Sequence, residues 1–98
     1  MFFNNEIDDS LHRLGERLRA QRLARNDNQA DFSARLGVSV PTLRDMESGA
    51  PTVSIGVWLA ALWMLDRLPD VDGLIAGASL FAEPVQRQRA RRKRAQAV

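Results

Sequence analysis

Apolar side chains recur at intervals of three and four residues along most of this chain, a spacing typical of amphipathic α-helices. The first helix is expected from about Asp9 to Arg25, with apolar residues on one face and mostly charged residues on the others. The leucines of that apolar face are Leu11, Leu14, Leu18 and Leu23. Later stretches predict four shorter helices, at about residues 29–36, 40–48 and 55–67 and from residue 69 onward. The pattern therefore predicts an all-α domain of five helices.

Residues that favour helix ends stand between these stretches. Asn28, Ser39 and Ser54 are N-cap candidates, because a short polar side chain can accept a hydrogen bond from a free N–H of the first turn. Gly37 and Gly49 follow the second and third helices, where a left-handed residue commonly ends a helix. A tight turn is therefore expected between these two short helices.

The fourth helix, from Ile55 to about Arg67, is apolar on almost every side. In a domain of this size a helix buries one side against its own core, so the other side favours a second copy of the chain or another protein. Alternatively, the first and fifth helices wrap the fourth completely. The pattern leaves both interpretations open.

Charge is distributed unevenly along the 98 residues, although the formal net charge is only +2. Eight basic and eleven acidic residues precede position 83, so the body is mildly acidic. The remaining six basic residues are Arg87, Arg89, Arg91, Arg92, Lys93 and Arg94. We therefore divide the chain into an N-terminal arm (1–8), a domain (9–82) and a basic tail (83–98) that is expected to be flexible. The tail has three interpretations: an arm on the DNA backbone, a segment that docks on an acidic protein, or a solvated end.

Several function classes have little support in the composition. The chain has no cysteine, which excludes disulfides and thiolate metal sites, and its single histidine, His12, cannot supply a metal cluster. The longest apolar run, residues 57–65, is less than half of the roughly 20 residues that span a bilayer. The N-terminus lacks the basic and apolar regions of a secretory signal. We therefore expect a soluble cytoplasmic protein that is not an enzyme, with no metal, no cofactor and no membrane partner.

Residues 28–49 carry the clearest functional signal. They contain the two short helices, separated by Gly-Val-Ser, with apolar residues at the positions that would face each other. This spacing suits a helix-turn-helix, whose second helix can enter the major groove of DNA. A generic helical hairpin shares the apolar spacing, so the pattern alone does not separate the two.

The segments QADFSARLGVS (29–39) and TLRDMESG (42–49) resemble the Xre family of phage-repressor-type (Cro-like) helix-turn-helix regulators. The resemblance extends from about Leu14 to Ile75. It implies a five-helix phage-repressor-type fold in which the second and third helices read double-stranded DNA. Residues 53–68 further resemble the fourth helix of HipB-like antitoxins, small repressors that bind their own operator and hold a HipA-related kinase toxin.

The resemblance also implies roles for individual residues. Asn28 and Gln29 match residues that grip a DNA phosphate at the start of the second helix, where free N–H groups favour an anion. Positions that would meet phosphates and base edges from the recognition helix are Ser39, Val40, Pro41, Thr42, Arg44 and Asp45. Arg22 and Glu47 match a partly buried salt bridge between the first and third helices, for which we favour a structural role.

Some positions depart from the family pattern. Asp27 stands where an apolar residue is usual, and its charge would either weaken a phosphate contact or face solvent. Val40 and Pro41 replace polar residues and can contact a thymine methyl but cannot hydrogen-bond through their side chains. Direct readout would then depend on Thr42 and on Arg44, which is a guanine reader in principle, together with DNA shape and dimer spacing.

Two functions are consistent with these observations. The first is a homodimeric, sequence-specific transcriptional repressor on an inverted-repeat operator, the autoregulating antitoxin of a toxin–antitoxin pair with a toxin protein as partner. The second is a protein-binding adaptor that uses the helix-turn-helix fold as a scaffold without specific DNA binding.

Overall fold

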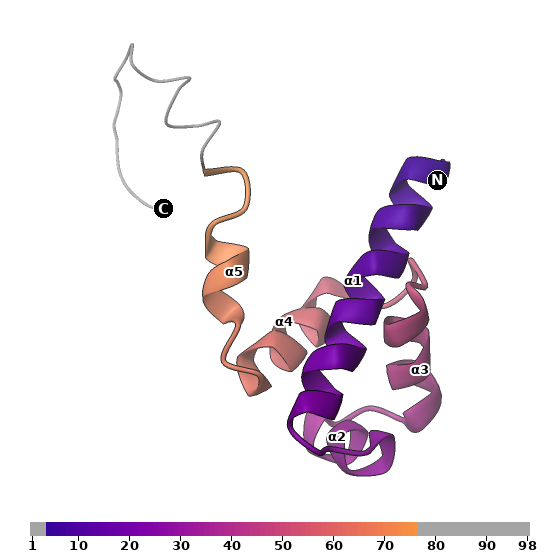
Figure 1. Ribbon diagram of the computed structural model, residues 1–98, viewed down its shortest axis with the longest axis vertical. Helices are drawn as coiled ribbons and strands as arrows, with labels where there is room; N and C mark the ends of the chain where they lie inside the picture. Colours follow the sequence, from indigo (N-terminus) through magenta and orange to yellow (C-terminus); the bar gives the residue numbers. More distant parts are fainter. Residues whose placement is uncertain (1–3, 77–98) are drawn as a thin grey trace. The chain divides into compact units, whose positions relative to one another are not determined.

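The computed structural model describes residues 4–76, which contain five α-helices and no strand (Figure 1). The helices are α1 (Asn5–Ala24), α2 (Gln29–Leu36), α3 (Val40–Ser48), α4 (Ile55–Met64) and α5 (Leu68–Asp72). The all-α prediction is thus confirmed for the described part of the chain. The chain divides after Leu68 into two compact units, and α1 to α4 lie in the first. The basic tail expected over residues 83–98 lies outside the described residues.

The two short helices begin and end where the sequence predicts. The side chain of Asn28 caps α2 by accepting a hydrogen bond from the backbone N–H of Asp31 at 2.8 Å. Ser39 caps α3 in the same way. Gly37 and Gly49 close α2 and α3 with φ angles of 83° and 85°, a left-handed conformation that favours glycine. Local hydrogen bonding therefore fixes the length of both helices.

The first helix starts earlier than predicted, at Asn5 rather than Asp9. Asn4 caps it by accepting a hydrogen bond from the N–H of Ile7 at 2.9 Å, and acidic residues in the first turn suit the positive end of the helix dipole. The described part of the segment expected as an arm, residues 1–8, is therefore mostly helical. All of residues 4–10 are exposed, so the first turns of α1 extend beyond the core (Figure 1).

The fourth helix ends at Met64, before the predicted end at Arg67. The reason is Asp66, whose backbone is left-handed with a φ of 58°. Leu65 turns into the core, where only 2% of its surface is exposed. Its carbonyl oxygen accepts a hydrogen bond from Nη2 of Arg25 at 2.7 Å, which satisfies a backbone group that the helix end leaves free.

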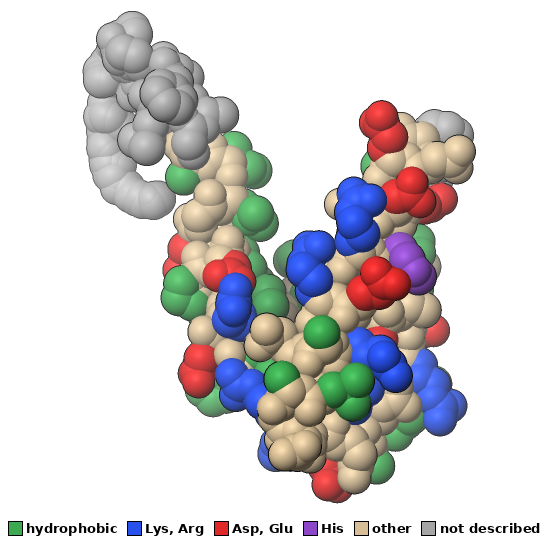
Figure 2. Space-filling model, viewed as in Figure 1, with side chains coloured by type: hydrophobic (Ala, Val, Ile, Leu, Met, Phe, Trp, Pro, Cys, Tyr) green, Lys and Arg blue, Asp and Glu red, His purple; other side chains and the backbone are tan. Residues whose placement is uncertain are grey.

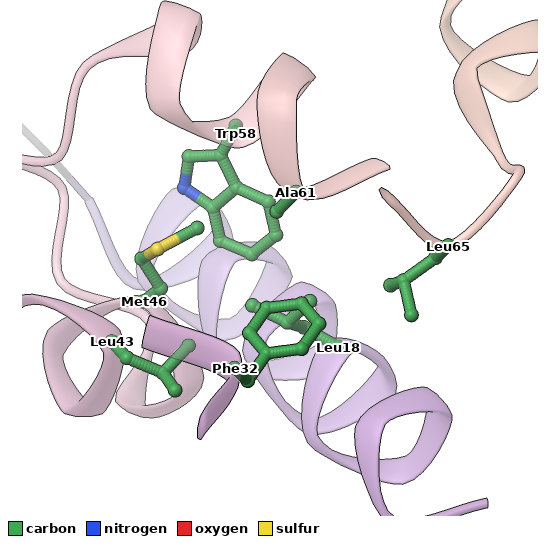
Figure 3. Close-up of a cluster of buried hydrophobic side chains, with 7 residues drawn as sticks. All are labelled: Leu18, Phe32, Leu43, Met46, Trp58, Ala61 and Leu65. Atoms are coloured by element: carbon green, nitrogen blue, oxygen red, sulfur yellow. The ribbon is translucent and has the colours of Figure 1, made fainter. Parts of the chain in front are cut away.

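The core of the first unit lies between α1, α2, α3 and α4 (Figure 3). Its buried apolar side chains are Leu18, Phe32, Leu43, Met46, Trp58, Ala61 and Leu65. Leu23 was expected on the buried face of α1 but is 46% exposed. The buried positions of α1 are Gly15, Leu18 and Arg22, and Leu23 lies about 100° around the helix from Arg22.

Two glycines bring α1 and α3 into backbone contact. A Cβ atom added to Gly15 would lie 2.5 Å from the carbonyl oxygens of Met46 and Glu47. A Cβ atom on Gly49 would lie 2.7 Å from backbone atoms of His12. Neither position has room for a side chain, so the absence of a side chain at these two glycines sets the distance between α1 and α3.

The fourth helix buries one face and exposes another. Trp58 is 7% exposed, whereas Ile55 is 71% and Trp63 is 68% exposed. The two exposed side chains lie eight residues apart, which separates them by about 80° around α4 and about 12 Å along it. The helix therefore presents apolar surface that the core of the first unit does not use.

Candidate nucleic-acid interface

The helices α2 and α3 with the turn between them form the helix-turn-helix. Phe32, Leu43 and Met46 anchor the pair in the core, which leaves the opposite face of α3 toward solvent. All of the candidate DNA-contacting residues are exposed or half-buried: Asn28, Gln29, Ser39, Val40, Pro41, Thr42, Arg44 and Asp45. The fold therefore places the whole set where DNA could reach it.

The start of α3 presents a mixed apolar and hydroxyl surface. The Oγ of Ser39 accepts a hydrogen bond from the N–H of Thr42 at 3.2 Å, and the two hydroxyl oxygens lie 3.0 Å apart. Val40 and Pro41 stand between them, and Pro41 has no N–H to offer a phosphate. Ser39 is thus engaged in capping, and contact with a thymine methyl group is the chemistry that the two apolar residues can supply.

A buried ion pair holds α3 against α1. Arg22 donates from Nε to Oε2 of Glu47 at 2.7 Å and from Nη2 to Oε1 at 3.1 Å. Each side chain is only 5% exposed, so the pair is buried more deeply than the sequence suggested. The remaining terminal nitrogen of Arg22, Nη1, donates to the carbonyl oxygen of Asp27 at 2.7 Å. One guanidinium therefore joins α1, α3 and the loop that leads into α2.

Gln29 lies between this ion pair and Arg44 on α3. Its Nε2 donates to Oε1 of Glu47 at 3.1 Å, and its Oε1 accepts a hydrogen bond from Nε of Arg44 at 3.4 Å. The sequence assigned Gln29 a phosphate contact only. The structure adds two internal partners, one buried and one on the exposed face of α3.

Asp27, in the loop before α2, is half-buried and paired. The side chain of Asp27 is 14% exposed and accepts two hydrogen bonds from the guanidinium of Arg35. The hydrogen bond to Asp27 raises the pKa of Arg35 above its ordinary value. Because Arg35 balances the charge of Asp27, the unfavourable effect on a nearby phosphate that the sequence suggested is reduced.

The described residues carry eight basic and eleven acidic side chains. Figure 2 shows acidic side chains at the N-terminal end of α1 and basic side chains further along it. Arg44 is the only basic residue of α3, and Asp45 follows it directly. Electrostatic attraction to DNA from α3 itself therefore depends on one arginine.

Other kinds of site are not formed by the residues that the structure describes. Within residues 4–76 no three His, Cys, Asp or Glu side chains are placed to hold a metal ion. No helix in the same range is long and apolar enough to cross a membrane. The exposed His12 has Nε2 3.3 Å from a carboxylate oxygen of Glu16, one turn further along α1.

Comparison with known proteins agrees with this geometry. Residues 13–72 match the family model of a helix-turn-helix domain, a segment that runs from α1 to the last residue of α5 and includes both α2 and α3. No significant match is found to a curated protein or to a solved structure. The matched segment is more than half of the chain, so the protein belongs to the helix-turn-helix domain family, whose members are DNA-binding regulators.

Proposed function

We propose that the protein is a cytoplasmic, sequence-specific transcriptional repressor that binds double-stranded DNA through α2 and α3. The observation that carries this proposal is that Thr42 and Arg44 of α3 remain accessible, while the buried Arg22–Glu47 pair holds α3 against α1. The proposed activity is binding rather than catalysis.

The proposed repressor acts as a homodimer. The exposed Ile55 and Trp63 of α4 support a protein partner, because each leaves most of a large apolar side chain in water. In a two-fold dimer the recognition helices lie about 34–36 Å apart, one turn of DNA, so the operator should be an inverted repeat.

The same apolar surface supports an antitoxin role. Residues 53–68, which resemble the fourth helix of HipB-like antitoxins, include all of α4. The toxin would be a HipA-related kinase held by the chain while it represses its own operator. A gene for such a kinase beside this one would favour the antitoxin role over a repressor without a toxin.

DNA binding is tested by the double variant Thr42→Ala, Arg44→Ala. Neither side chain belongs to the buried core, so the fold should persist while affinity for the upstream region of the protein's own gene falls about 10- to 100-fold. Gel shifts against competitor DNA measure the affinity, and circular dichroism checks the fold. Arg13→Ala is the matched control, because it removes one exposed arginine from the N-terminal half of α1.

Two results would contradict this proposal. Unchanged operator binding by the double variant would show that the outer face of α3 does not read DNA. A wild-type chain with no preference for the upstream region at moderate salt would instead favour the adaptor function, in which the helix-turn-helix is only a scaffold.

The basic tail is tested separately, by deleting residues 85–98. If its six basic side chains contact phosphates, the slope of log affinity against log salt concentration should fall by up to about 5. A variant that keeps the tail but replaces those six residues with glutamine separates charge from length. An unaltered slope would remove the DNA-arm interpretation and leave a protein partner or a solvated end.

A further inference from the structure

The orientation of the Gln29 amide is determined by its partners. Glu47 Oε1 accepts hydrogen bonds from Nη2 of Arg22 and from Nε2 of Gln29, each at 3.1 Å. An ionised carboxylate can only accept, so the amide nitrogen of Gln29 must face Glu47. Its amide oxygen is therefore turned the other way, toward the exposed face of α3.

The amide oxygen of Gln29 is hydrogen-bonded to Nε of Arg44. The Nε–H of Arg44 donates to Oε1 of Gln29 at 3.4 Å, a long hydrogen bond on the exposed surface. Arg44 has no carboxylate within 4 Å among the described residues, so no ion pair there competes for its guanidinium. A bond at Nε leaves both terminal amino groups of the guanidinium available, as two parallel donors.

We propose that Gln29 is a positioning residue that sets Arg44 to read one guanine through its two terminal amino groups. The major-groove edge of guanine offers two acceptors, O6 and N7, which match this pair of donors. The buried ion pair fixes the Gln29 amide, the amide restrains the Arg44 side chain, and a restrained arginine loses less side-chain entropy when it binds. This inference rests on the proposed function.

The proposal separates two roles for Gln29. A residue that binds a phosphate would strengthen binding to every DNA sequence about equally, because phosphates carry no base information. A positioning residue would strengthen binding only to sequences that have guanine at the position read by Arg44. Because both ends of the Gln29 amide already have protein partners, the second role fits the contacts better.

The test is a double-mutant cycle on the full chain with Gln29→Met and Arg44→Ala. A binding site is first selected from random DNA with the wild-type protein, and each base pair of the site is then substituted. The guanine that Arg44 reads is identified as the one whose substitution weakens DNA binding by the wild-type protein but not by the Arg44→Ala variant. We expect Gln29→Met to lower the ratio of specific to non-specific affinity about tenfold, and to have little further effect in the Arg44→Ala background.

A change in the DNA gives an independent measurement. With the wild-type chain, 7-deazaguanine at that position removes the N7 acceptor and should weaken binding about tenfold. In Gln29→Met the same base change should cost much less. Gln21→Met is the matched control, since it removes another half-buried glutamine amide, on α1, and should leave the ratio unchanged.

Other outcomes overturn the proposal. Additive effects of the two substitutions, or an equal loss on specific and non-specific DNA, would assign Gln29 to phosphate contact instead. If Gln29→Met melts at a lower temperature, Gln29→Ala replaces it in the cycle, because alanine is the better helix former. A wild-type chain that selects no site contradicts the proposed function itself, whereas additivity at a selected site contradicts only the positioning role.

Discussion

Replacement of Glu47 with alanine is expected to lower the free energy of unfolding by about 3–5 kcal/mol, the usual cost of breaking a buried ion pair from one side. Arg22, only 4% exposed, would keep its charge in the core without a counter-ion. Gln29 would lose the acceptor of its amide nitrogen at the same time. Because small domains have only about 5–15 kcal/mol in total, this change should remove much of the stability.

Urea unfolding followed by circular dichroism measures this loss. The informative control is the double variant Arg22→Met, Glu47→Leu, which removes both charges and fills the space with apolar side chains. It should recover most of the lost stability, because uncharged side chains of similar volume often replace a buried pair at little cost. Recovery should be incomplete, since Arg22 also donates to the Asp27 carbonyl. A Glu47→Ala variant as stable as the wild type would show that the pair does not hold α1 and α3 together.

Substitution of Gly15 with alanine should lower the free energy of unfolding by about 1–3 kcal/mol, although alanine is the better helix former by about 1 kcal/mol. The added Cβ would lie 2.5 Å from two backbone carbonyl oxygens of α3, which cannot rotate away as a side chain could. α3 must therefore move relative to α1. Because α3 carries most of the candidate DNA-contacting residues, DNA affinity should fall together with stability.

Gly56→Ala provides the matched control for this prediction. Gly56 lies in the first turn of α4, and the nearest atom to an added Cβ is the side-chain oxygen of Ser54 at 3.9 Å. The substitution should therefore stabilise the domain, by up to about 1 kcal/mol. In a domain of this size each kcal/mol moves the melting temperature by about 4–8 °C. Thermal unfolding should therefore show a lower melting temperature for Gly15→Ala and a higher one for Gly56→Ala. If both substitutions stabilised the protein, the close approach of α1 and α3 would be contradicted.

The parts of the fold that depend on local chemistry could be predicted from the sequence. The limits of α2 and α3 follow from Asn28, Ser39, Gly37 and Gly49, whose capping roles involve residues only a few positions away. The start of α1 was harder to place because Asn4, Asp8, Asp9 and Ser10 are all capable caps. The end of α4 was placed too late because apolar residues continue through Leu65, and periodicity does not show the left-handed turn at Asp66.

Contacts between distant positions could not be predicted in the same way. The resemblance to a known family predicted the Arg22–Glu47 ion pair. Nothing in the spacing of residues predicted the contact of Gln29 with Arg44 or of Asp27 with Arg35. Such contacts depend on side-chain directions across two packed helices or a loop, which spacing along one element does not determine. Gly15 did carry a signal: a glycine inside a leucine-rich helix is costly, and a close helix contact is a common reason for it.

The exposed first turns of α1 also have a practical consequence. A helix of 20 residues is about 30 Å long, and α2 lies beside the opposite end of α1 (Figure 1). The chain has no cysteine, so Asp8→Cys would create a unique thiol on an exposed turn. A fluorescent dye attached there would lie outside the candidate DNA-contacting residues, and its anisotropy would report rotation of the protein when DNA is added. The part of α1 that contributes least to the core is therefore a suitable place to label this protein.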